Sequence, residues 1–169
     1  YRRDITVRLI EAGERPGGNH RWSWFASDLS LPGAALLAPM RKTEWDSGYG
    51  VCFPDHRRQL ATPYRSLASA DFAAALEREL APETLLVRRR AAALDAGGVT
   101  LADGSRISAR AVVDARGFAP TAHLKGGWQV FMGRHMRLKQ PHGLIQPVIM
   151  DAEVEQLGGY RFVYVLPLS

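Results

Sequence analysis

Residues 5–18 read Ile5-Thr-Val-Arg-Leu-Ile-Glu11-Ala-Gly-Glu-Arg-Pro-Gly-Gly18, and they are the strongest guide to the fold class. A β-branched and apolar run that ends on an acid and enters a glycine loop is typical of a buried parallel strand. In dinucleotide-binding folds, the acid that ends the second strand accepts hydrogen bonds from the adenosine ribose hydroxyls. Glu11 is the candidate for that role, because one carboxylate can accept from both hydroxyls. An ordinary acidic strand end before a glycine turn is the alternative.

The double glycine Gly17-Gly18 lets the backbone pass close to a cofactor, where any Cβ would collide. The phosphate-binding G-x-G-x-x-G loop belongs about twenty residues before the ribose acid, which places it ahead of Tyr1. The chain also enters a strand almost at once and stops within the apolar run 162–169. We therefore interpret both ends as internal positions of a longer protein. The expected fold is α/β, with an incomplete Rossmann-type dinucleotide-binding domain at 1–120 that lacks its first strand and its glycine-rich loop.

Asn19-His-Arg-Trp-Ser-Trp24 directly follows the glycines and holds two aromatics, an imidazole, an amide and a guanidinium. We expect a loop here that lines a flavin or holds a polyene through stacking and cation-π contacts. A solvent-facing loop anchored by two tryptophans is the alternative.

The remaining pattern predicts one helix and several short strands. Ser69 is a candidate N-cap, Asp71 suits the first turn, and Phe72, Leu76 and Leu80 form one stripe that ends before Pro82. That spacing predicts about three helical turns. A change of character near 119–127 predicts an incomplete, β-rich substrate domain at 121–169. The expected strands are 84–88, 91–96, 99–102, 110–115, 128–133, 145–154 and 160–166.

Two further polar positions are candidates for function. Asp114-Ala-Arg116-Gly117 follows a predicted strand and resembles the place where flavoproteins return the chain to the cofactor, so Arg116 is a candidate cofactor contact. A surface arginine at a capped strand end is the alternative. Asp151 interrupts an apolar strand, so we expect it to be paired or to face a cavity, because an unpaired buried carboxylate is costly.

Composition excludes several classes of protein. Cys52 is the single cysteine and the five histidines lack metal-ligand spacing, so no metal site is expected. No G-x-S-x-G hydrolase motif occurs. The cations are scattered despite a net charge of +5, which favours contact with anionic lipid headgroups over nucleic acid. No apolar run reaches membrane-spanning length. We expect a cytoplasmic protein that is peripheral to the membrane and binds no nucleic acid.

The sequence resembles the bacterial lycopene beta-cyclase family over nearly its whole length. The most specific runs are Gly-Gly-Asn-His-x-Trp-Ser and Tyr-Arg-Phe-Val-Tyr-x-Leu-Pro-Leu, whereas an acid followed by two glycines is common among flavoproteins. The resemblance is carried, in order, by Glu11–Ser23, Val112–Phe118, Trp128–Phe131, Pro141–Leu144, Pro147–Ala152 and Gly159–Ser169.

The resemblance implies a carotenoid cyclase that turns the linear ends of lycopene into β-ionone rings. In that family FAD works in its reduced form, NADPH is the usual reductant, and the reaction has no net redox change. An acid protonates the terminal double bond, the neighbouring double bond closes the ring, and loss of a proton leaves the ring alkene. The family's catalytic carboxylate would follow Ser169, so no catalytic residue is assigned here and the chain alone is expected to be inactive.

The resemblance makes Glu11 the ribose ligand and places Gly17, Gly18 and Arg116 near the cofactor. Two other interpretations stay open. An FAD-dependent monooxygenase of the same fold shares the acid and the double glycine, although the loop at 19–24 favours the cyclase. A non-catalytic fragment is the other, and a ligand titration would separate it from the enzymes.

Overall fold

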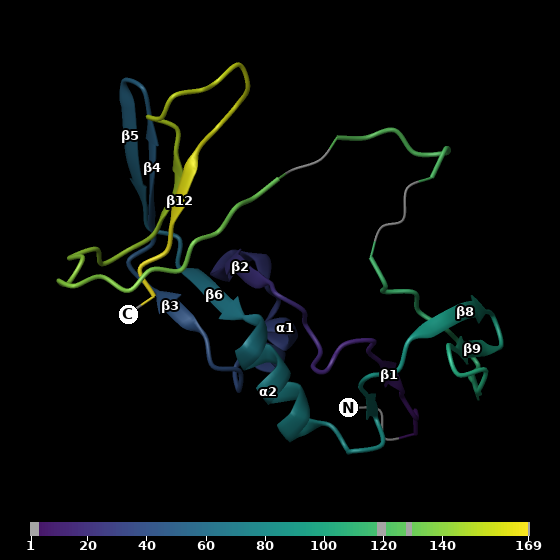
Figure 1. Cartoon of the computed structure of the whole chain (residues 1–169). Coiled ribbons are helices and arrows are strands. Elements are labelled where there is room, and N and C mark those ends of the chain that lie inside the picture. Colours follow the sequence, from purple (N-terminus) through teal and green to yellow (C-terminus); the bar gives the residue numbers. More distant parts are fainter. Residues whose placement is uncertain (1–3, 118–120, 128–129, 169) are drawn as a thin grey trace.

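The computed structural model describes residues 4–117, 121–127 and 130–168. It is rich in short sheets and has few helices (Figure 1). The elements in chain order are β1 (Leu9–Ile10), β2 (Arg21–Phe25), η1 (Ala26–Asp28), α1 (Leu31–Leu37), β3 (Thr43–Trp45), β4 (Tyr49–Phe53), β5 (His56–Leu60), β6 (Tyr64–Ala68), α2 (Ser69–Glu79), β7 (Leu85–Leu86), β8 (Ala91–Asp95), β9 (Gly98–Leu101), β10 (Arg106–Ser108), β11 (Val148–Asp151) and β12 (Val163–Val165).

The best-buried part of the molecule is the sheet β2-β6-β3, in which β6 is the central strand and both pairings are antiparallel. Tyr64, Ser66 and Leu67 of β6 are all buried. Helix α2 continues directly from this strand, and it buries Ala73 and Ala75. Small side chains at these two positions allow the helix to approach its neighbours closely.

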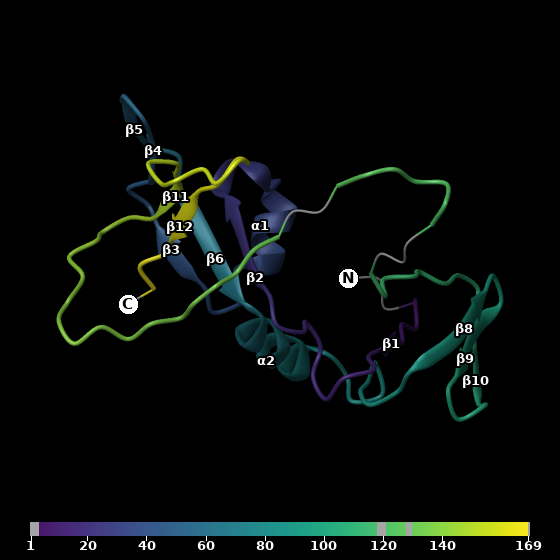
Figure 2. The same cartoon turned by 45° about the horizontal axis from the view of Figure 1, so that its top comes forward.

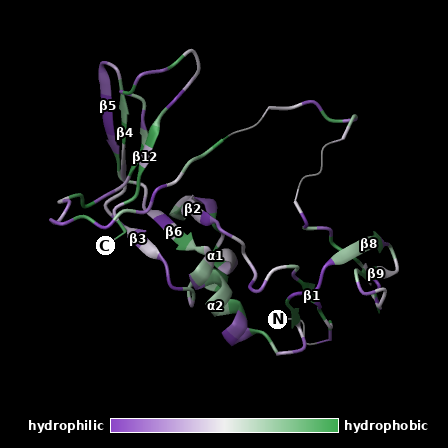
Figure 3. Ribbon diagram, viewed as in Figure 1, coloured by the Kyte–Doolittle hydropathy of each residue, from purple (hydrophilic) through white to green (hydrophobic). Residues whose placement is uncertain are grey.

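A second sheet joins distant parts of the sequence in the order β12-β11-β4-β5. The β4-β5 hairpin is antiparallel, β11 adds to β4 in parallel, and β12 closes the other edge. Edge strand β5 is hydrophilic (Figure 3), and charged edges discourage pairing with other chains. The described residues between β10 and β11, at 109–117, 121–127 and 130–147, form no helix or strand (Figures 1 and 2).

The predicted helix is confirmed as α2, with Asp71 in its first turn. Two details of the prediction were wrong. The N-cap is Ala68, which offers no side-chain cap, and Ser69 is the first helical residue. The buried positions are Ala73 and Ala75, whereas Phe72 and Leu76 are half-buried.

Five predicted strands overlap an observed one: 84–88, 91–96, 99–102, 145–154 and 160–166. The strand predicted at 110–115 does not form, and residues 130–133 of the strand predicted at 128–133 are not in a strand; Trp128 and Gln129 lie outside the described residues. The loop predicted at 19–24 was also wrong, because β2 begins at Arg21. Propensity cannot show which segments find a hydrogen-bonding partner.

The buried strand predicted from Ile5 was only partly correct. Only Leu9 and Ile10 pair, and they do so with β7 alone. Ile5 and Val7 are 48% and 56% exposed. With a single two-residue neighbour, the start of this segment has nothing to cover it.

Candidate functional site

Glu11 follows β1, which pairs in parallel with β7. The pairing extends past the strands, because the Glu11 N–H donates to the Leu86 carbonyl at 2.9 Å and the Arg89 N–H donates to the Glu11 carbonyl at 2.9 Å. Chain direction therefore places Glu11 at the carboxyl end of a parallel strand. This is the position in which a ribose-binding acid would lie.

The Glu11 side chain is held by its own loop. Its Oε1 atom accepts a hydrogen bond from the Gly13 N–H at 2.6 Å. Its Oε2 atom accepts no hydrogen bond from any residue the structure describes. The carboxylate thus has a fixed orientation and one oxygen that can accept from a ligand hydroxyl, so its donor chemistry fits a ribose.

Gly17 and Gly18 have positive φ angles of +92° and +57°. A Cβ on Gly17 would lie 3.1 Å from Phe72 Cδ1 and 3.2 Å from Trp22 Cη2, and one on Gly18 would lie 3.3 Å from His20 Cδ2. Contact with the protein's own aromatic rings and the backbone conformation are therefore enough to require glycine at Gly17. The predicted contact of Gly17 and Gly18 with a cofactor stays a prediction.

The aromatic residues after the glycines contact the protein's own rings, although Trp22 is 38% exposed. Trp22 lies edge-on against Phe72 of α2, with ring centroids 5.1 Å apart, and His20 lies 5.8 Å from Trp22. The register of β2 sets Trp22 opposite Leu67 of β6. In this structure Trp22, which belongs to the segment predicted as a ligand-lining loop, packs β2 against α2.

Arg116 lies in an exposed, extended segment. Its guanidinium donates to both carboxylate oxygens of Asp114, at 2.9 and 2.8 Å. These bonds, with one from the Arg116 N–H, lower the pKa of Asp114 to about 2. Among the described residues Arg116 bonds only to Asp114, so the structure does not bring it to Glu11, Gly17 or Gly18.

Asp151 ends β11 and is half-buried, and its Oδ1 atom accepts from the Glu153 N–H at 3.1 Å. Side-chain ligand atoms of Cys52, Asp151 and Glu153 lie within 4.8 Å of one another. Glu153 is already ion-paired with Arg57. Sequence reasoning did not predict this grouping, because it depends on the parallel pairing of β11 with β4.

The last part of the chain meets the β2-β6-β3 sheet at Tyr64 and Trp45. The hydroxyls of Tyr64 and Tyr164 are 2.6 Å apart, and Trp45 Nε1 donates to the Pro167 carbonyl at 3.2 Å. Phe25 packs on Tyr64 with ring centroids 5.0 Å apart. Burial, together with the bond to Tyr164, raises the pKa of Tyr64 above its ordinary value.

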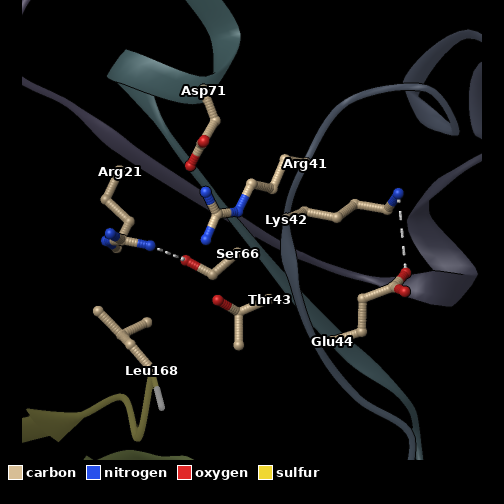
Figure 4. A pocket seen from close by; sticks show the side chains of 8 residues that line it. All are labelled: Arg21, Arg41, Lys42, Thr43, Glu44, Ser66, Asp71 and Leu168. Carbon is tan, nitrogen blue, oxygen red and sulfur yellow. Dashed lines mark hydrogen bonds and ion pairs between the residues drawn. The ribbon is translucent and has the colours of Figure 1, made fainter.

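A cavity of about 530 Å³ lies between the same sheet and the first turn of α2 (Figure 4). Sequence reasoning missed it, because its residues come from several separate segments. Leu168 is the one apolar residue among those that line it, so the cavity does not suit a hydrocarbon. The lining residues are Arg21, Arg41, Lys42, Thr43, Glu44, Ser66, Asp71 and Leu168.

Comparison with known proteins shows similarity along the whole chain. A family model described as "Lycopene cyclase protein" matches residues 1–169. The lycopene beta-cyclase of Pseudescherichia vulneris is 46% identical over 165 residues, which are 98% of this chain and 42% of that protein. The lycopene beta-cyclases of Pantoea ananas and a Paracoccus species are 43% and 44% identical, over 98% and 99% of this chain and 43% of each relative.

The chain therefore spans about two fifths of the length of these relatives. No solved structure matches. None of the helices within the described residues is long and apolar enough to cross a membrane.

Proposed function

The chain belongs to the lycopene cyclase family, and we propose that the protein containing it converts the linear ends of lycopene into β-ionone rings. The identity of 43–46% along nearly the whole chain is the observation that carries this proposal. The structure supports it by placing Arg21 of the first family-specific run and Leu168 of the second on the lining of one cavity.

We further propose that the first part of the chain is an incomplete Rossmann-type FAD domain, with NADPH as the reductant. The parallel β1-β7 pair and the position of Glu11 at its carboxyl end support this assignment. Glu11 would hold the adenosine ribose through Oε2, while Gly13 fixes the orientation of the carboxylate through Oε1. Gly17, Gly18 and Arg116 stay predicted cofactor neighbours.

The reaction is an acid-base cyclisation in which one proton enters and one leaves. Reduced FAD, when bound, supplies negative charge that stabilises a carbocation electrostatically. In this account the chain's own residues bind and orient the nucleotide, and the proton donor lies outside these residues. The enzyme class is an intramolecular lyase or isomerase.

Product mass tests the proposal. The longer protein that contains this chain, supplied with reduced FAD and lycopene without oxygen, should form a cyclic product of unchanged mass, because protonation and deprotonation cancel. NADPH should be needed only to keep the flavin reduced. A monooxygenase would require oxygen, add one oxygen atom and consume NADPH in step with product. Mass spectrometry with a count of NADPH per turnover decides between them, and an oxygen-dependent, heavier product would overturn the cyclase assignment.

Peripheral contact with the cytoplasmic face of a membrane is also proposed. Its support is the exposed segment 130–139, where Val130, Phe131 and Met132 are 86%, 67% and 93% exposed. Cations follow directly at Arg134, Arg137 and Lys139. Apolar side chains next to cations suit an interface with anionic headgroups.

A further inference from the structure

The cavity beside α2 is polar, and three cations, Arg21, Arg41 and Lys42, are among the residues that line it. The Arg21 guanidinium points at Ser66, and the Arg41 guanidinium lies between Asp71 and Ser66 (Figure 4). Ser66 is 1% exposed, and it bonds to Arg21 Nη1 at 3.3 Å and to Ser23 Oγ at 3.1 Å. A buried hydroxyl held from two sides forms the fixed floor of this cavity.

The other lining charges are already engaged with the protein. Lys42 Nζ donates to the Leu37, Ala38 and Met40 carbonyls at 3.3–3.4 Å, around the end of α1. Glu44 lies 2.9 Å from Arg65 Nε and 3.8 Å from Lys42 Nζ. These contacts turn Lys42 and Glu44 toward their own partners and leave two guanidiniums and one carboxylate, Asp71, to meet a ligand.

The two guanidiniums lack carboxylate partners. Arg41 makes no hydrogen bond or ion pair with any residue in the described ranges, and Arg21 bonds only to Ser66. Two like charges directed at one point repel, and an anion between them relieves that repulsion. Guanidinium groups bind phosphate through paired, charge-assisted hydrogen bonds, and the Thr43 hydroxyl adds a neutral donor.

Asp71 determines what accompanies the anion. It lies in the first turn of α2 and lines the same cavity. A carboxylate repels a bare phosphate, because both are negatively charged. A sugar hydroxyl next to the phosphate would donate to Asp71. The volume of about 530 Å³ is within the range of small-ligand sites.

We propose that this cavity binds the phosphorylated ribose of a nucleotide, with the phosphate between Arg21 and Arg41 and a ribose hydroxyl on Asp71. The choice of nucleotide rests on the proposed function, in which Glu11 already holds the adenosine ribose of FAD. The ligand of this cavity is then the 2′-phosphorylated ribose of the nicotinamide nucleotide.

Titration calorimetry on the 169-residue chain tests the site with three probes: 2′,5′-ADP, 5′-ADP and inorganic phosphate. Saturable binding of one nucleotide, tighter than inorganic phosphate and weakened by salt, is expected. Preference for 2′,5′-ADP over 5′-ADP is expected, because only 2′,5′-ADP carries the 2′-phosphate, and preference for 5′-ADP would overturn the assignment to the nicotinamide nucleotide. Tighter binding of inorganic phosphate than of either nucleotide would overturn the ribose assignment, and no saturable binding of any probe would overturn the whole proposal.

Arg41→Gln should weaken nucleotide binding by roughly tenfold or more, as for loss of a charge-assisted bond. Because Arg41 makes no bond to the described residues, this variant should keep the parent's circular dichroism and melting temperature. Arg58→Gln is the matched control, since Arg58 is an exposed arginine of β5 outside the cavity. Asp71→Asn should weaken nucleotide binding and strengthen binding of inorganic phosphate. Equal losses in Arg41→Gln and Arg58→Gln would mean that binding is nonspecific.

These measurements are independent of cyclase activity. If this chain binds the nucleotide but the longer protein does not cyclise lycopene, the proposed function is wrong and the proposed site stands. If the longer protein cyclises lycopene but Arg41 takes no part in nucleotide binding, the proposed site is wrong and the proposed function stands.

Discussion

The residues of this chain differ in whether near or distant neighbours in the sequence determine their conformation. The orientation of the Glu11 carboxylate is set by Gly13, two positions later, whereas Gly17 is restricted by Phe72, which lies on α2. The acid at a strand end could therefore be recognised from its neighbours in sequence. The aromatic contacts of Gly17 could not, because they depend on how α2 packs.

Glu11→Ala in the longer protein should weaken FAD binding by about 1.5–3 kcal/mol, the range for hydrogen bonds to a charged group. The flavin dissociation constant, followed by fluorescence, is the measurement. Glu14→Ala is the control, because Glu14 is an exposed carboxylate of the same loop that pairs with Arg88. An unchanged constant in Glu11→Ala would show that the ribose is bound elsewhere.

Gly17→Ala should destabilise the folded chain by about 1–3 kcal/mol, because alanine at positive φ is strained and its Cβ would press on Phe72 and Trp22. Gly104→Ala separates these two causes. Gly104 has a similar φ of +83° and nothing within 4 Å of its Cβ position, so only the backbone strain applies. Urea unfolding measures both variants, and an equal loss of stability in the two would contradict the role given to the aromatic contacts.

At the scale of elements, the junction of β6 with the segment around β12 joins residues 64 and 164 of the chain. Tyr64 is 7% exposed and its hydroxyl bonds to that of Tyr164. Burial and this bond raise the Tyr64 pKa, which means that folding favours the protonated phenol.

The stability of this junction should therefore decrease at alkaline pH. An unfolded tyrosine titrates near about pH 10. The Tyr64 contribution is fully present below that pH and is lost as the pH rises from there toward the higher folded pKa. Urea unfolding at increasing pH should show a loss of stability that is smaller in Tyr64→Phe. Tyr160→Phe is the control, as Tyr160 is 66% exposed. Identical pH profiles for Tyr64→Phe and the parent would contradict this account.

At the scale of the whole molecule, the exposed segment 130–139 holds the apolar and cationic residues proposed to meet the membrane. The chain should float with vesicles that contain phosphatidylglycerol more than with vesicles of phosphatidylcholine alone, because anionic headgroups attract the cations.

Replacing Phe131 and Met132 with serine should reduce that flotation, since it removes apolar area from the interface. Val113→Ser is the control, because Val113 is 89% exposed but lies outside the segment. Equal flotation with the two kinds of vesicle, or no effect of the double replacement, would remove the membrane proposal.

The sequence alone determined the features that depend on neighbours within a few residues. Helix α2, with Asp71 in its first turn, follows from its spacing and from Pro82. The family could be recognised as well, because its motifs are contiguous runs. The expected ribose acid was likewise found at a strand end.

Tertiary structure alone decided which segments pair. Arg21–Phe25 is a strand because β6 lies beside it, whereas residues 110–115 have strand-forming composition and no partner. The cavity also arises only when β2, β6 and the first turn of α2 meet, which brings Arg21, Ser66 and Asp71 together. Strand pairing and cavity lining are contacts between residues far apart in the chain, and no local pattern encodes them.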